Sequence, residues 1–395
     1  MLIRTAFRLV SFALLLFSLG CEKESESIVS IALHPTNTQI LYVATNDAVY
    51  KSRNAGTSWE RFPSFSARRV TTLGIDPQFP ATVYAGTMAD AVYKSPDGGQ
   101  HWLPHNVGLK EHVSFINEFV FDSTNNEQIY IATTVGVFNS KDGGREWEER
   151  MAGMKEVHIV TSIAIHPTNP RILYAGTTGG VYRSEDGANS WKKINTGLIP
   201  ETELMGAMAL GVNAIVFDPV TPDTVYAGTT KGLFRTANGG ASWERIGDGL
   251  KDPFVSSLLI NPAQPSQLYL GGPGGVWKSL DSGKTWQAMN AGLTSLNIRS
   301  LAMSPKNPQE LFVGTPLMTP FAVARDGSQF YTVRQPRRAP QPVTDLTLIL
   351  NWTATWPTSS NRSNVWAEGA ETRPLSSLPI SLSSSIRSTS RPHAL

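Results

Sequence analysis

A short phrase recurs seven times along this chain, and its spacing constrains the fold more than any other feature. The phrase, named the Asp turn here, runs from Ser or Thr through Asp or Asn and Gly to an aromatic residue, most clearly at Ser95–Trp102 and Ser140–Trp147. Successive copies lie 43 to 52 positions apart, as Asn54 to Asp97 and Asp186 to Asn238 show. A period of this length indicates an array of repeated supersecondary units rather than two or three unrelated domains.

Each repeat also carries signals for four short strands. An apolar alternation comes first, as at residues 163–165, and Pro167 follows it closely. A second strand reads Val-Tyr-Ala-Gly-Thr at 83–87, a third precedes the Asp turn, and a fourth begins near its Trp. Alternation of period two that ends at Pro or Gly is typical of strands. Four antiparallel strands per repeat, arranged radially, predict an all-β fold, a seven-bladed β-propeller of four-stranded blades over residues 28–333.

The Asp turn resembles the Asp-box, or BNR repeat, and the resemblance covers residues 28–333. Propellers of this kind occur in sialidases, xyloglucanase-type glycoside hydrolases and sortilin-type receptors. The chain as a whole is most similar to a fourth group, the photosystem II assembly-factor propellers. That resemblance implies a single propeller that binds a protein client, such as an assembly intermediate of a membrane protein.

The conserved positions of the Asp turn are predicted to brace a hairpin. An Asp or Asn side chain accepts backbone N–H groups, Gly takes positive φ at no steric cost, and Trp supplies a large buried surface. The alternative, a ring of calcium sites or catalytic acids, is disfavoured because calcium takes six to eight oxygen ligands and each turn offers one carboxylate. We therefore predict no metal and no cofactor. The predicted structural residues are Asn54, Trp59, Asp97, Trp102, Asp142, Trp147, Asp186, Trp191, Asn238, Trp243, Asp281, Trp286 and Asp326.

The N-terminus indicates export. Residues 1–20 combine Arg4 and Arg8 with an apolar run that is too short to span a bilayer, as in a signal peptide. The following Cys21 is the only cysteine, and residues 18–21 resemble a bacterial lipobox, although Ser18 departs from the usual Leu. We expect lipidation at Cys21, a tether at 21–27 and a place in the bacterial cell envelope. The alternative is an ordinary signal peptide with an incidental Cys.

The C-terminal residues 334–395 change composition and are rich in Ser, Pro and Arg, which is typical of disordered or linker segments. Within them, residues 346–352 could form one strand that latches the last blade. An alternative is that a frameshift replaced the native C-terminus. The net charge of +2 gives no reason to expect a nucleic-acid partner, and we expect a monomer.

A partner is expected on the face opposite the Asp turns, where the segments that join the blades vary. The longest of these segments, 195–213, includes an apolar run at 204–210 that either contacts a partner or folds over its own blades. Basic side chains on this face are either a partner site or scattered solvated charges. They are Arg68, Arg69, Lys110, His112, Lys155, His158, Lys251 and Arg299.

Catalysis is the weaker alternative. A sialidase needs an arginine triad, and the Arg-Ile-Pro motif that usually carries its first arginine is absent. A xyloglucanase-type enzyme needs two facing propellers with one carboxylate each. Glu118, Asp90 and Glu111 are candidate carboxylates, but no spacing pairs them, so no catalytic residue is predicted. His34 and His166 are interpreted as turn residues rather than metal ligands. Glycan binding or hydrolysis remains the alternative function, and a purely structural envelope lipoprotein is a third.

Overall fold

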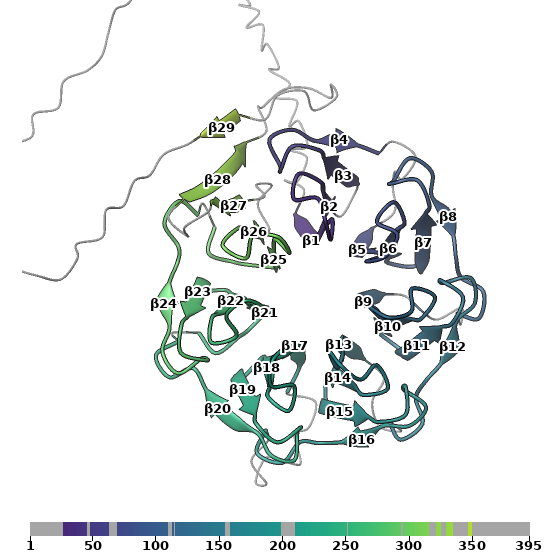
Figure 1. Cartoon of the computed structure of the whole chain (residues 1–395), viewed down its shortest axis with the longest axis vertical. Coiled ribbons are helices and arrows are strands. Elements are labelled where there is room, and N and C mark those ends of the chain that lie inside the picture. The colour runs from purple at the N-terminus through teal and green to yellow at the C-terminus, as the bar shows by residue number, and fades with distance from the viewer. Residues whose placement is uncertain are drawn as a thin grey trace, which may run out of the picture. The chain divides into compact units, whose positions relative to one another are not determined.

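The computed structural model describes residues 27–45, 48–62, 69–109, 113, 115–154, 159–198, 210–250, 252–293 and 295–315, and the backbone of 321–324, 329–334 and 347–349. In these residues the fold is all-β, and the sheets are arranged in a ring around a central axis (Figure 1). Contacts divide the chain into residues 1–353 and 354–395, and every described residue belongs to the first unit. This described part contains no helix that could cross a membrane.

Six sheets are four-stranded blades whose strands follow one another from the centre outward. The first blade contains β1 (Ile28–Leu33), β2 (Leu41–Thr45), β3 (Val49–Ser52) and β4 (Glu60–Arg61). The second contains β5 (Val70–Ile75), β6 (Val83–Thr87), β7 (Val92–Ser95) and β8 (Leu103–Pro104). The third contains β9 (Ile116–Phe121), β10 (Ile129–Thr133), β11 (Gly136–Ser140) and β12 (Glu148–Glu149).

The remaining blades repeat this order. The fourth contains β13 (Val160–Ile165), β14 (Leu173–Thr177), β15 (Gly180–Ser184) and β16 (Lys192–Lys193). The fifth contains β17 (Val212–Phe217), β18 (Val225–Thr229), β19 (Gly232–Thr236) and β20 (Glu244–Ile246). The sixth contains β21 (Ser257–Ile260), β22 (Leu268–Gly272), β23 (Gly275–Ser279) and β24 (Gln287–Ala288).

The prediction of a seven-bladed propeller of four-stranded blades is wrong, because the structure contains six blades of that kind. The last repeat instead enters a five-stranded sheet, named the closing sheet here, formed by β25 (Ser300–Met303), β26 (Leu311–Gly314), β27 (Phe321–Ala324), β28 (Gln329–Arg334) and β29 (Thr347–Ile349). The six-residue β28 is longer than the outer strands of the six blades and leaves an edge that can pair. There β29 adds in antiparallel register, with Thr332 opposite Ile349. This strand comes from the segment in which the sequence suggests a latch.

The ring closes by packing of the first blade against the closing sheet. The amide of Ile28 in β1 donates to the carbonyl of Thr315, 3.2 Å away, directly after β26. Ile28, Trp59, Ala302 and Phe312 belong to one buried apolar cluster that spans the two ends of the chain. No strand is exchanged between the first blade and the closing sheet among the described residues, and the two meet through side chains and one backbone hydrogen bond.

The inner strands are joined to their neighbours by hydrogen bonds from polar side chains. Thr71 Oγ1 in β5 donates to the carbonyl of Ile116 in the next blade over 2.5 Å, and Asn117 Nδ2 donates to that of Val160 over 2.6 Å. Equivalent bonds run from Thr161, Asn213 and Ser256. They satisfy carbonyl groups at or just before the start of five inner strands, so the seams between blades are polar as well as apolar.

The second strand leaves room for the neighbouring blade. A Cβ added at Gly86 in β6 would lie 2.5 Å from the Cβ of Ile116 in the next blade. The Gly of the repeated Tyr-Ala-Gly-Thr sequence is therefore required for close approach of two sheets rather than for a turn.

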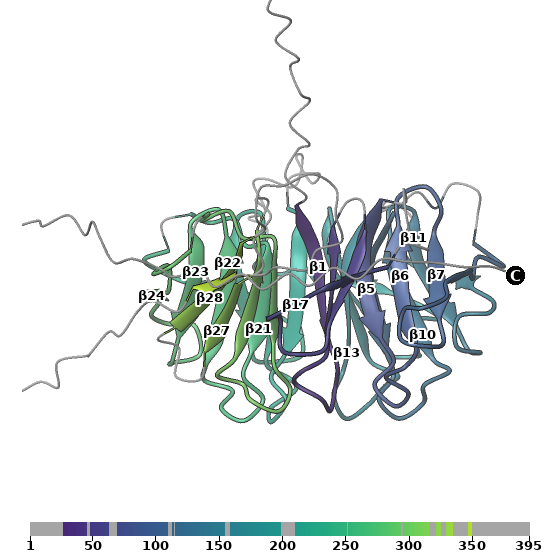
Figure 2. The ribbon, with the colours of Figure 1, turned by 90° about the horizontal axis from the view of Figure 1, so that it is seen from above.

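The loops form two distinct faces of the ring (Figure 2). On the first, named the turn face, the Asp turns contact the turns between first and second strands, as where the amide of Gly143 donates to the carbonyl of Glu127. On the second, named the link face, the turns between second and third strands contact the segments that join blades. There the amide of Met88 donates to the carbonyl of Arg69. The two faces place the repeated and the variable loops on opposite sides.

Candidate functional site

The Asp turn is a closed hydrogen-bond motif, and Asp142 shows its geometry. Ser140 Oγ donates to Asp142 Oδ1 over 2.7 Å and accepts the amide of Gly144 over 2.8 Å. The same Oδ1 accepts the amides of Arg145 and Glu146 over 2.9 and 3.0 Å. One carboxylate oxygen thus satisfies three donors within seven residues.

The other described copies have the same arrangement. The side chains that accept the equivalent amide are Asn54, Asp97, Asp186, Asn238 and Asp281, while Asp326 lies outside the described residues. Hydrogen bonds from Thr285 lower the pKa of Asp281 to about 2, and those to Asp142 outweigh burial and hold its pKa below the usual value. A carboxyl that is ionised and saturated in this way is poorly suited to act as a general acid.

The tryptophans of the Asp turns connect neighbouring blades. Trp147 Nε1 donates to the carbonyl of His105 over 2.9 Å, Trp191 Nε1 to that of Arg150 and Trp243 Nε1 to that of Ile194, each in the preceding blade. In contrast, Trp102 and Trp286 donate to carbonyls of their own turns. The indole of Trp59 is buried and its Nε1 has no partner among the described residues.

Residues of the preceding blade also reach the Asp turn, and the sequence analysis did not predict this contact. Tyr42 Oη and Lys51 Nζ both donate to the carbonyl of Gly98, over 3.1 and 3.0 Å. Lys94 Nζ makes the same bond to Gly143 over 2.8 Å, beside Tyr84. The recurrence of Tyr in the second strand and of Lys or Arg in the third was the available signal. The Asp turn is therefore part of the seam between blades.

We expect Asp142→Ala to lower the free energy of unfolding by about 2 kcal/mol, because three donors lose their acceptor. Asp142→Asn should cost much less, since Asn54 and Asn238 accept the same amide in two other blades. Thermal or urea unfolding of the two variants measures the difference. Equal destabilisation by Ala and Asn would contradict the bracing role.

The link face carries exposed basic and apolar side chains. Of the predicted basic residues, Arg69 and Arg299 are described, and both are exposed at the entrances of inner strands. Among the segments that join blades, Ile159 and Phe254 are 39% and 37% exposed, and Leu296, in the same segment as Arg299, is 45% exposed. The positions of Arg68, Lys110, His112, Lys155, His158 and Lys251 lie outside the described residues, as do 199–209 of the long link.

Glu118 is the only titratable side chain on the inner strands, and the structure assigns it to a seam. Its Oε2 accepts the amide of Ile163 in the next blade over 2.8 Å, a position where Ser30 and Ser257 accept the equivalent amide in other blades. Burial raises its pKa to about 7, and the hydrogen bond from Ile163 opposes this shift.

No second carboxylate contributes to the raised pKa of Glu118. Asp90 is exposed in a turn of the link face, and its backbone carbonyl accepts a hydrogen bond from Asn106 Nδ2. Glu111 lies outside the described residues. Two catalytic carboxylates of a glycosidase lie about 5–10 Å apart and affect one another's ionisation, so Glu118 does not behave as half of such a pair.

Metal ligation finds no support in the described ranges, which hold no group of three or more His, Cys, Asp and Glu side chains arranged around a common point. The Nδ1 atom of His34 accepts the amide of Asn37, and that of His166 accepts the amide of Asn169. Both histidines act as the first residue of a turn on the turn face.

The raised pKa of Glu118 predicts a loss of stability as pH rises. At acidic pH the carboxyl of Glu118 is protonated in both the folded and the unfolded protein. Between the unfolded pKa of 4.5 and the folded pKa of about 7, only the folded protein keeps this proton. The free energy of unfolding therefore falls as the pH rises through this window. Glu118→Gln keeps an acceptor for Ile163 and should remove the fall. The variant should be more stable than the parent by about 1–3 kcal/mol at pH 8 and similar at pH 4. Parallel curves for the two proteins across this pH range would contradict the assignment.

Solved structures similar to this chain include two kinds of propeller protein. The GH74 enzyme of Niastella koreensis matches with a TM-score of 0.62 and 14% identity over 78% of this chain and 57% of the enzyme. The GH74 xyloglucanase of Xanthomonas campestris matches with a TM-score of 0.59 and 14% identity over 83% and 58% of the two chains. YCF48 bound to a D1 peptide matches with a TM-score of 0.56 and 17% identity over 75% and 92%.

These matches show a shared β-propeller fold. The chain spans little more than half the length of these two GH74 structures. No protein-family model and no curated protein sequence matches the chain.

Proposed function

We propose that this chain is a non-catalytic Asp-box propeller of the cell envelope that binds a protein partner in the manner of an assembly factor. The observation that carries the proposal is the composition of the link face, where Arg69 and Arg299 are exposed in the same layer of loops as Ile159, Phe254 and Leu296. Exposed apolar side chains among cations suit a polypeptide better than a small polar substrate.

The comparisons support a partner of this kind. The chain covers 92% of the YCF48 propeller, whose structure includes a D1 peptide, but only 57% and 58% of the two GH74 chains. A single ring therefore matches nearly all of the peptide-binding protein and about half of each enzyme. We propose that the partner contacts the link face. Its loops vary between repeats, whereas the Asp and Asn side chains of the Asp turns are occupied by hydrogen bonds within those turns.

Glycan binding or hydrolysis is the alternative, and the likeness to the GH74 enzymes favours it. Hydrolysis would need a second carboxylate near Glu118 or elsewhere in the ring. No second carboxylate contributes to the raised pKa of Glu118, and its carboxylate accepts a structural hydrogen bond from Ile163. Both observations weigh against a catalytic role for Glu118.

A charge-reversal experiment tests the protein-binding proposal. The double variant Arg69→Glu/Arg299→Glu should lose the partner that the parent protein recovers from cross-linked native membranes, because the two described cations in the segments that join the blades at the predicted site become acidic. Arg171→Glu is the matched control, since Arg171 is exposed on the turn face. Equal loss in the control, or hydrolysis of a glycan panel by a parent protein that recovers no partner, would overturn the proposal.

We also propose that the chain is exported and anchored by a lipid on Cys21, which lies outside the described residues. The basic and apolar residues of 1–20 and the Gly20-Cys21 junction support it. In a bacterial host that processes lipoproteins, the full chain should incorporate an alkyne-labelled fatty acid and sediment with membranes. Cys21→Ser should abolish both properties, and unchanged labelling of this variant would contradict lipidation at this residue.

A further inference from the structure

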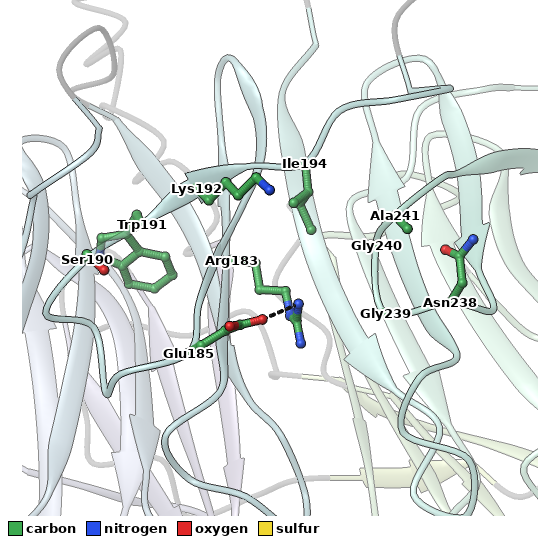
Figure 3. Close-up of a pocket in the computed structure, with 10 residues that line it drawn as sticks. All are labelled: Arg183, Glu185, Ser190, Trp191, Lys192, Ile194, Asn238, Gly239, Gly240 and Ala241. Atoms are coloured by element: carbon green, nitrogen blue, oxygen red, sulfur yellow. Dashed lines mark ion pairs between the residues drawn. The ribbon is translucent and has the colours of Figure 1, made fainter.

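A groove lies at the outer rim of the ring between the fourth and fifth blades (Figure 3). It encloses about 350 Å³, near the lower limit for sites that hold small molecules. One wall comes from the fourth blade and the other from the Asp turn of the fifth. The lining residues that carry the argument are Arg183, Glu185, Lys192, Ile194 and Gly239.

At two other seams, which join the first three blades, a cation of the third strand fills the corresponding space. Lys51 and Lys94 each donate to the carbonyl of the first Gly in the next Asp turn. In the groove, Arg183 occupies the equivalent strand position but pairs with Glu185, with 2.6 Å between Nη1 and Oε1. The carbonyl of Gly239 then accepts a hydrogen bond from Tyr174 Oη alone among the described residues.

Glu185 distinguishes this seam from the others. The residue after the first Ser or Thr of the Asp turn is Arg53, Pro96, Lys141, Ala237 or Leu280 in the other described blades, and none of these is acidic. The side chain of Glu185 is 68% exposed, so one carboxylate oxygen remains available to a ligand beside the ion pair. The ion pair of Arg183 thus follows from one departure from the repeat, and Tyr174 remains the donor to the carbonyl of Gly239.

The lining combines donors and acceptors with an excess of positive charge. Lys192 in β16 is the cross-strand partner of Arg183 in β15, which places a second cation on the same side of the sheet. The groove is lined by two cations and one carboxylate, together with the carbonyl of Gly239 and the apolar side chain of Ile194. A fitting ligand therefore carries one negative charge and also has groups that donate hydrogen bonds to Glu185 and Gly239.

We infer that this groove binds a single ring of a sugar acid, with its carboxylate at Lys192 and its hydroxyl groups at Glu185 and the carbonyl of Gly239. An acidic side chain supplies the charge, but its carboxylate has no donor for Glu185 or the carbonyl of Gly239, whereas the hydroxyl groups of a sugar acid can donate to both. The inference is independent of the proposed protein partner, because the groove lies on the rim and contains no residue of the link face.

Titration of the full chain with glucuronate, followed by ligand-observed NMR, tests the site. The parent protein should bind glucuronate more tightly than glucose. Lys192→Ala should weaken glucuronate about tenfold, because it removes a charge-assisted hydrogen bond. Ala241→Phe places a bulky side chain at an exposed position of the groove wall and should abolish binding without disturbing the core.

Lys193→Ala is the matched control, because Lys193 is the next residue of β16, faces the other side of the sheet and does not line the groove. It should leave glucuronate binding unchanged. Equal weakening by Lys192→Ala and Lys193→Ala would indicate diffuse attraction and overturn the site. Equal affinity for glucose would overturn the carboxylate assignment, and the absence of binding at about 10 mM glucuronate would overturn the inference as a whole.

Discussion

A hydrogen bond from a tyrosine hydroxyl to a carbonyl in the next blade's Asp turn connects the outer hairpin of each of three blades to the blade before it. Tyr42, Tyr84 and Tyr174 each donate to the first Gly of the following turn, over 3.1, 2.9 and 2.6 Å. The turn itself is closed by its Asp or Asn, so this outward carbonyl is the acceptor that remains. Because a blade cannot supply its own donor, its outer hairpin is complete only when the preceding blade is in place.

Much of this arrangement could be predicted from the sequence, because alternation and turn residues are local signals. The strands around Val83–Thr87 and Ile163–Ile165 follow from period-two alternation, and the Asp turns follow from residue chemistry. The seam contacts could not be predicted in the same way. Thr71 and Asn117 are ordinary polar residues of a half-buried strand until the fold places a carbonyl of the next blade beside each of them.

The number of strands in the closing sheet illustrates another limit of repeat analysis. The period of the sequence gives the number of copies of the Asp turn, but it does not predict a strand that comes from outside the repeats. β29 lies in a segment of different composition, and it pairs with β28 because that outer strand is long enough to present an open edge. A similar limit applies to Glu118. In the sequence, its carboxylate is a candidate for catalysis. In the fold, it accepts a backbone amide of the next blade, as Ser30 does at the equivalent position.

The proposed groove arises where one seam departs from a contact that two other seams share. Where Lys51 or Lys94 spans the seam, the space between two blades is filled and the turn carbonyl has two donors. Glu185 diverts Arg183 from that role without breaking the seam, since Tyr174 still holds Gly239. At this seam the cation contact is lost while the tyrosine contact remains, and the groups released there become available to a ligand.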